Sequence, residues 1–148
     1  MIFTLIPATV KVTEAEIKAW SRSAAWGNAD AEYNLGVCYA NGNGVPKDLV
    51  AAVKWWRRAA GRGEAKAQHN LGCCHYTGSG VDQNVVMAFK WWRLAAKGDL
   101  AEAQFNLGRC YASGNGAAKD PVEAAAWYRK AAGKGHEESR NALRELEK

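Results

Sequence analysis

Small and apolar side chains in this chain recur at intervals of three and four residues, the spacing of one face of an α-helix. One such stripe consists of Ala31, Leu35, Cys38 and Tyr39, and a second runs through residues 52–60. Polar and charged side chains fill most of the positions between them. The pattern predicts two amphipathic helices that follow one another closely.

Turn and capping residues mark the ends of these helices. The first is predicted to stop at the Gly-Asn-Gly sequence of residues 42–44, because glycine adopts the left-handed C-cap conformation without strain. The second is predicted to start after Asp48, whose carboxylate accepts hydrogen bonds from free backbone amides, and to end by Gly63. Further upstream, Thr13 and Glu16 form a capping box, which predicts another helix start.

The same pattern returns every 36 residues. The letters WWRRAA of residues 55–60 reappear as WWRLAA at 91–96 and as WYRKAA at 127–132. Other positions that repeat at this interval are Asn34, Asn70 and Asn106; Leu35, Leu71 and Leu107; Cys38, Cys74 and Cys110; and Ala52, Ala88 and Ala124. A fixed period of this length is typical of helical repeat proteins.

The period divides the chain into units and predicts an all-α fold of about eight helices. The expected divisions are a short N-terminal tail at 1–12, then a repeat domain at 13–148 with a half-repeat at 13–27, full repeats at 28–63, 64–99 and 100–135, and a polar C-terminal cap helix at 136–148. One helix pair cannot bury its own apolar face, so each neighbour must supply the same surface at the same interval.

Core packing accounts for most of the aromatic and thiol side chains. The chain holds seven tryptophans, and we expect the large rings at positions 56, 92 and 128 to lie in the core. The four cysteines are Cys38, Cys73, Cys74 and Cys110. Equivalent positions in stacked repeats lie on the order of 10 Å apart, too far for a disulfide, so we expect free, buried thiols. Such thiols fit a reducing compartment.

The N-terminal sequence MIFTLIPATV does not predict a signal peptide, because it carries no basic residue before its short apolar run. No run in the chain reaches the ~18 apolar residues of a membrane span, and we expect a soluble protein. Together with the free cysteines, this favours the cytoplasm, with secretion or delivery from a bacterium into a host as alternatives. The net charge of +5 favours acidic partners only weakly.

The repeated residues carry a family resemblance. The pattern A-x-x-x-L-G-x-x-Y-x-x-G-x-G-V from Ala31, followed by D-x-x-x-A-x-x-W-W/Y-x-x-A-A-x-x-G from Asp48, resembles the Sel1-like repeat, a relative of the tetratricopeptide repeat. The resemblance covers roughly residues 14–148. The departures from the pattern are His75 in place of tyrosine, Asn84 in place of aspartate, Asp99 in place of the closing glycine and Ala117 in place of valine.

The resemblance implies a right-handed α/α superhelical solenoid, in which the first helices of the repeats line a concave face. Proteins of this kind usually act as adaptors or scaffolds that hold other proteins or peptides. We therefore expect a monomeric, non-catalytic module that binds a protein or peptide and needs no cofactor.

Residue types suited to catalysis or metal binding do not assemble into a recognised motif. His69 and His75 stand six apart, on roughly opposite sides of a helix, and neighbouring side chains in the Cys73-Cys74-His75 run point about 100° apart. We expect no catalytic residue and no metal site. One enzyme alternative comes from the resemblance, because cysteine-rich secreted Sel1-like proteins were proposed to bind or cleave β-lactams. Those repeats are stapled by cysteine pairs, whereas each repeat here has one core cysteine.

Basic residues on the predicted second helices support a further alternative, the binding of nucleic acid through phosphate contacts. These residues are Arg57, Arg58, Arg62, Lys66, Lys90, Arg93, Lys97, Arg129, Lys130 and Lys134. We prefer a solvated outer face, because no aromatic residues interleave these charges in a way suited to base stacking.

The predicted binding surface is the face of the first helices, where side chains outside the core stripe form three ladders. The ladder residues are Tyr33, His69 and Phe105; Asn34, Asn70 and Asn106; and Val37, Cys73 and Arg109. Tyr76 would add an aromatic anchor near the middle, where binding energy tends to concentrate. The resemblance to peptide-binding tetratricopeptide proteins implies that the asparagines bond a peptide backbone. Equally, each asparagine can satisfy backbone groups of the neighbouring repeat.

Overall fold

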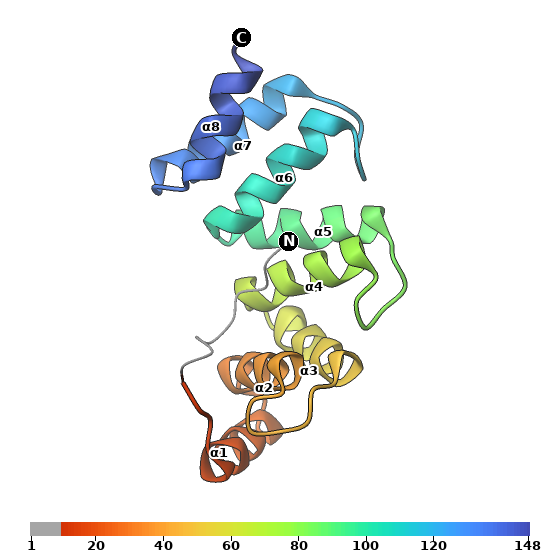
Figure 1. Ribbon diagram of the computed structural model, residues 1–148, viewed down its shortest axis with the longest axis vertical. Coiled ribbons are helices and arrows are strands. Elements are labelled where there is room, and N and C mark those ends of the chain that lie inside the picture. The colour runs from red at the N-terminus through yellow and green to blue at the C-terminus, as the bar shows by residue number, and fades with distance from the viewer. Residues whose placement is uncertain (1–9) are drawn as a thin grey trace.

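A computed structural model describes residues 10–148, which form eight α-helices and no strand. In chain order they are α1 (Glu14–Ala25), α2 (Ala29–Asn41), α3 (Leu49–Gly61), α4 (Ala65–Thr77), α5 (Val85–Lys97), α6 (Ala101–Ser113), α7 (Pro121–Gly133) and α8 (Glu137–Leu146). The helices are stacked in sequence along the long axis of the molecule (Figure 1). The predicted all-α solenoid of about eight helices is confirmed.

Side-chain caps start the helices where the sequence predicts them. Thr13 and Glu16 form the capping box of α1, and Asp48 accepts a hydrogen bond from the backbone amide of Ala51 at the start of α3. Asn84, which stands where Asp48 and Asp120 stand in the other repeats, caps α5 in the same way. The first helix of each repeat ends at a left-handed glycine, and these residues are Gly42, Gly78 and Gly114.

Within each repeat, the first helix contacts a large aromatic ring of the second through a glycine. A Cβ atom on Gly72 would collide with the indole of Trp92, and one on Gly36 would collide with the indole of Trp56. The third repeat has the same contact with a smaller ring, since a Cβ on Gly108 would lie 2.6 Å from Tyr128 Cε1. Glycine is therefore needed at this position because the two helices approach so closely.

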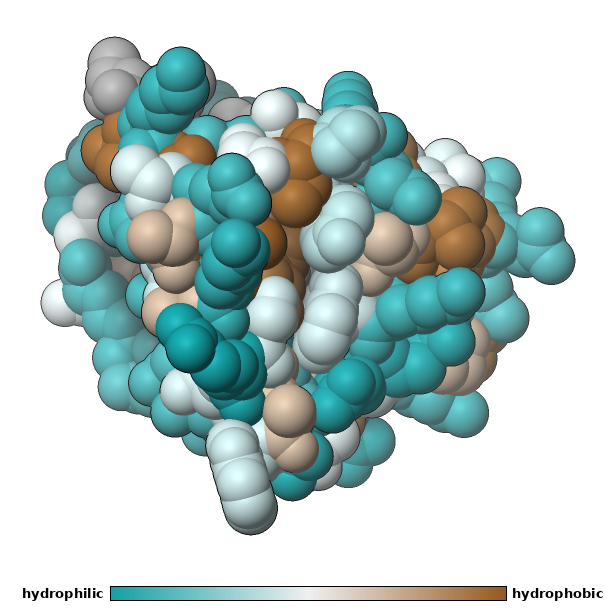
Figure 2. All heavy atoms as spheres, turned by 90° about the horizontal axis from the view of Figure 1, so that it is seen from below, coloured by the Kyte–Doolittle hydropathy of each residue, from teal (hydrophilic) through white to brown (hydrophobic). Residues whose placement is uncertain are grey.

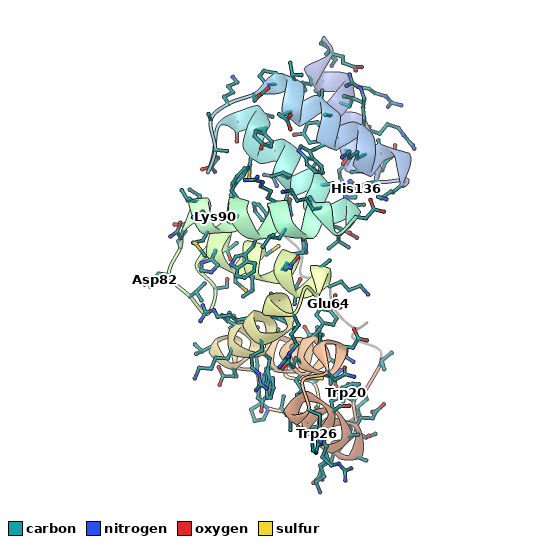
Figure 3. The ribbon with its side chains drawn as sticks, turned by 180° about the vertical axis from the view of Figure 1, so that it is seen from behind. Trp20, Trp26, Glu64, Asp82, Lys90 and His136 are labelled. Atoms are coloured by element: carbon teal, nitrogen blue, oxygen red, sulfur yellow. The ribbon has the colours of Figure 1, made fainter. Side chains whose placement is uncertain are left out.

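The aromatic side chains mostly pack as predicted, with one exception. Trp56 and Trp92 are fully buried, and Tyr128 is buried in the same position of the third repeat. Trp26, directly after the last residue of α1, is 92% exposed and does not contribute to the core. Figure 3 labels it, together with Trp20, at the α1 end of the stack.

Neighbouring repeats contact each other through the loops inside them. A Cβ on Gly80, in the α4–α5 loop, would lie 2.5 Å from the carbonyl oxygen of Leu49 at the start of α3. The loop residue Asp82 lies along one edge of the stack, whereas Glu64 and His136, the N-caps of α4 and α8, lie along the opposite edge (Figure 3). The loops within repeats and the connections between repeats thus occupy different edges.

The helices α1 and α8 form the two ends of the stack. Viewed from the α1 end, hydrophobic residues are scattered among hydrophilic and intermediate ones (Figure 2). At the other end, α8 contributes only Ser139 to the set of buried residues. Within residues 10–148, no helix has both the length and the hydropathy needed to cross a membrane. The predicted tail at 1–12 falls mostly outside the described residues.

Candidate functional site

A pocket with a volume of about 380 Å³ opens between α4 and α6. Its lining residues come from two successive repeats: Tyr76, Trp92, Asn106, Arg109, Cys110, Ala112, Ser113, Asn115 and Tyr128. Three of these, Tyr76, Asn106 and Arg109, belong to the predicted binding face. We call this cavity the α4–α6 pocket.

Aromatic rings form the apolar part of the α4–α6 pocket. The ring centroids of Tyr76 and Trp92 lie 5.5 Å apart, with an angle of 41° between the ring planes. On the other side, the wall residue Tyr128 packs against Phe105, which lies outside the lining, with ring centroids 5.9 Å apart and an angle of 39° between the ring planes. Such tilted pairs are a favourable arrangement for aromatic rings. Because Trp92 and Tyr128 are also core residues, the stacked repeats themselves hold the pocket walls in place.

Arg109 supplies the positive charge of the α4–α6 pocket. Its guanidinium carbon lies 5.7 Å from the centre of the Phe105 ring, a cation–π contact beside the pocket. Burial raises the pKa of the Tyr128 hydroxyl, and the charge of Arg109 opposes that rise. Burial also raises the pKa of the Cys110 thiol to about 11, again with Arg109 acting in the opposite direction. The guanidinium therefore acts electrostatically on the pocket walls.

Hydrogen bonds at the end of α6 order the polar rim. The Ser113 hydroxyl donates to the carbonyl oxygen of Arg109 at 2.8 Å. The backbone amide of Asn115 donates to the Ser113 hydroxyl at 3.3 Å. Asn106, which is 7% exposed, lines the pocket with a side chain that can both donate and accept hydrogen bonds.

The structure places the ten predicted site residues in different environments. Half-buried or exposed positions, which present surface to a partner, are Tyr33, Asn34, Tyr76, Phe105 and Arg109. The buried ones are Val37, His69, Asn70, Cys73 and Asn106, of which Asn106 lines the α4–α6 pocket. Val37 and Cys73 pack within the hydrophobic core clusters. The third ladder is therefore not a single surface, because only Arg109 in it is exposed.

The sequence interpretation did not identify Trp92, Cys110, Ser113, Asn115 and Tyr128 as pocket residues. They come together only because α6 and the loop after it pack against the preceding repeat. One signal was present in the sequence, namely Tyr128 at the position where the other repeats have tryptophan. A smaller ring at a core position leaves space that the repeat pattern alone does not predict.

The four cysteines are free and buried, as the sequence predicts. Burial raises the pKa of Cys73 and that of Cys74 to about 12 in each case. The Sγ atom of Cys73 lies 3.6 Å from Nε2 of His69. Thiols with raised pKa values stay protonated at neutral pH and are poor nucleophiles.

The basic residues of the alternative nucleic-acid surface are partly committed to ion pairs. Arg58 and Arg62 both contact the buried carboxylate of Glu32, at 3.1 Å in each case. Lys134 pairs with Asp99 at 2.6 Å. Lys66 lies in the first turn of α4, not on a second helix as the sequence interpretation assumed.

Comparison with known families agrees with the geometry. The family model of the Sel1 repeat matches residues 29–64, 65–100 and 101–136, which together make up most of the chain. The chain belongs to the Sel1 repeat family. Proteins with this repeat are generally protein-interaction modules and are typically non-catalytic. No curated protein matches the chain.

Solved structures of other Sel1 repeat proteins are similar over nearly the whole chain. A Sel1 repeat protein from Oxalobacter formigenes is 35% identical, with 88% of this chain and 98% of that one covered and a TM-score of 0.83. The protein c5321, a protective antigen present in uropathogenic Escherichia coli strains, is 37% identical over 85% of this chain and 27% of its own, with a TM-score of 0.81. This chain thus corresponds to about a quarter of the length of c5321.

A third structure supports the Sel1 repeat fold alone. The cysteine-rich protein B of Helicobacter pylori is 17% identical, with 86% of this chain and 96% of that one covered and a TM-score of 0.68. Between these two proteins the solenoid architecture is shared although few residues are identical.

Proposed function

We propose that this Sel1 repeat protein is a non-catalytic adaptor or scaffold module that holds a protein or peptide along the face of its first helices. The α4–α6 pocket is the anchoring point of that face. The observation that carries the proposal is the meeting of Tyr76, Asn106 and Arg109, each predicted from a different feature of the sequence, in one cavity.

The chemistry of the pocket supports a binding role. Binding sites concentrate their energy in a few aromatic and arginine side chains that are surrounded by weaker contacts. The α4–α6 pocket offers Tyr76 and Arg109 at its mouth and two core rings behind them. Because the walls are part of the repeat interface, little conformational freedom has to be lost on binding.

The state of the thiols supports the non-catalytic part of the proposal. Cys110 supplies the thiol of the pocket, and burial raises the pKa of that thiol to about 11. An activated cysteine requires a lowered pKa, which a neighbouring base or cation supplies. The opposing charge of Arg109 does not reverse the effect of burial.

A pull-down with matched variants tests the proposal. The bait is the wild-type chain beside a face variant, Tyr76→Ala with Asn106→Ala, and a control variant, Lys90→Ala with Arg93→Ala, whose changes lie on exposed positions of α5. We expect the wild type and the control to recover the same proteins and the face variant to lose them. Circular dichroism verifies that all three baits are folded. Equal recovery by all three would then contradict the proposed binding face.

A further inference from the structure

Arg109 carries a charge that the described chain leaves uncompensated. The residue is exposed, and among residues 10–148 no carboxylate forms an ion pair with it. Its contact is with the ring of Phe105. The lining of the α4–α6 pocket includes no aspartate and no glutamate.

Arg58 and Arg129 differ from Arg109, because each of them pairs with a carboxylate. Arg58 stands over the ring of Trp55 at 4.9 Å, as Arg109 stands over Phe105, but Arg58 also pairs with Glu32. Arg129 pairs with Glu147 at 3.2 Å. A guanidinium held over a ring beside an acid-free pocket can donate hydrogen bonds to a carboxylate from outside the chain.

The pocket walls favour an apolar group on the ligand, next to the carboxylate that pairs with Arg109. Tyr76, Trp92 and Tyr128 present ring surface within the cavity, while Arg109 is exposed at its rim. We infer that the α4–α6 pocket binds an internal segment of a partner chain in which an aspartate or glutamate stands next to an aromatic or large apolar residue. The acidic side chain pairs with Arg109, and the apolar side chain enters between the rings. This inference rests on the proposed function and adds the class of sequence that is recognised.

An internal segment fits the surface better than a chain end. The face continues on both sides of the pocket, with Tyr33 and Asn34 half-buried on α2 and with Phe105 against His136, whose rings lie 4.9 Å apart. A bound chain can thus enter and leave the pocket along neighbouring repeats. The amide groups of Asn106 and Asn115 can bond its backbone on the way.

The test uses a synthetic library of random octapeptides that are acetylated at the N-terminus and amidated at the C-terminus, so that only side chains carry charge. We expect the wild-type chain to select peptides with an aspartate or glutamate next to an aromatic or large apolar residue. Each selected peptide is then compared with its asparagine or glutamine analogue by isothermal titration, against the wild type, Arg109→Gln and the control Arg93→Gln. Arg109→Gln should weaken the acidic peptide by about tenfold or more, leave the analogue unchanged, and thereby remove the preference for the acid. Arg93→Gln should keep it.

The outcomes separate this inference from the proposed function. Selection of peptides without an acid overturns the inference alone, as does an acid preference that survives Arg109→Gln. A second library with free C-termini provides the comparison, and binders found only in that library overturn the internal segment in favour of a chain end. Failure of both libraries to yield a binder to the folded wild type overturns the peptide-binding function together with the inference.

Discussion

The Oε2 atom of Glu32 lies 3.1 Å from Nε of Arg62, and the Glu32 side chain is fully buried. Its other oxygen, Oε1, lies 3.1 Å from Nε of Arg58. One buried carboxylate in the first repeat thus pairs with two arginines. Arg58 lies on α3, and Arg62 is the residue directly after that helix. Both arginines remain about half exposed, so water still solvates the outer side of the cluster.

The same position in the next two repeats is glutamine, with a different partner. The Nε2 atoms of Gln68 and Gln104 donate to the carbonyl oxygens of Ala60 and Ala96, at 3.2 Å in each case. A carboxylate cannot donate, so in the first repeat a different group must reach the equivalent carbonyl. Arg58 does so, with Nη2 lying 3.4 Å from the carbonyl oxygen of Ala24.

Replacing Glu32 tests this exchange of partners. Glu32→Ala should lower the free energy of unfolding by about 2 kcal/mol, because it removes the hydrogen-bonded ion pair with Arg62 and the ion pair with Arg58 from a buried site. Glu32→Gln should cost clearly less, since the amide can donate to Ala24 as Gln68 does to Ala60. Urea denaturation of the three proteins measures the difference. An equal loss in both variants would contradict the exchange.

The close approach of Gly72 to Trp92 predicts that one methyl group added at position 72 lowers the stability of the fold. Gly72→Ala should destabilise the protein by about 1–3 kcal/mol, because the new Cβ has to displace a fully buried indole. Gly61→Ala is the matched control, since a Cβ there meets nothing within 4 Å. Thermal unfolding followed by circular dichroism compares the two. Similar melting temperatures for both variants would show that the helices can move apart freely.

Asp99 holds a backbone conformation that the other repeats give to glycine. Its φ is 69°, and the equivalent glycines at 27, 63 and 135 also have positive φ. Asp99→Gly should therefore raise the melting temperature, and Asp99→Ala should lower it, because alanine keeps the strain and loses the ion pair with Lys134. A gain with alanine equal to that with glycine would rule out backbone strain as the cause.

The ion pair of Asp99 adds a pH dependence to this comparison. The hydrogen bond and charge of Lys134 lower the pKa of the Asp99 carboxyl. A lowered pKa in the folded state contributes stability above the unfolded pKa, and that contribution is lost as the pH falls through the folded value. The advantage of Asp99→Gly over the wild type should therefore increase in acid, as melting curves at neutral and acidic pH would measure.

The lowered pKa of His75 predicts a second pH dependence of the stability, at a higher pH. Burial of the imidazole and the charge of Arg57 lower its pKa, against a hydrogen bond with the backbone of Asp82 that raises it. Below the unfolded value of about 6.5, the unfolded chain binds a proton that the folded His75 resists, so stability falls as the pH decreases. His75→Tyr, the residue of the other repeats, should reduce this loss. Urea denaturation at pH 7.5 and 5.5 measures it, and an unchanged pH dependence in the variant would contradict the assignment.

The periodic features of the fold were predictable from the sequence because they depend on local spacing. The stripe through Ala31 and Leu35, the cap at Asp48 and the glycine stop after α2 each follow from a few adjacent residues. The confirmed burial of Trp56 and Trp92 follows from the same stripe. These elements repeat because the interface between helix pairs repeats.

The candidate site was less predictable because it depends on how repeats meet. Positions 37, 73 and 109 were predicted to form one ladder on the binding face, yet Val37 and Cys73 are buried and Arg109 is exposed. Equivalent positions in successive repeats can therefore differ in burial because the packing around them differs. The buried charge of Glu32 was also not predicted, although the equivalent residues of the next two repeats, Gln68 and Gln104, are uncharged.

Site-specific photo-crosslinking tests the central claim, that the first-helix face holds the partner, most directly. A benzophenone amino acid replaces Tyr76 in the α4–α6 pocket in one protein and Val86, 49% exposed on α5, in another. Irradiation in a lysate of the source cells should yield a covalent adduct with a defined partner from position 76 and none from position 86. Adducts that form only from position 86, or equally from both positions, would contradict the account.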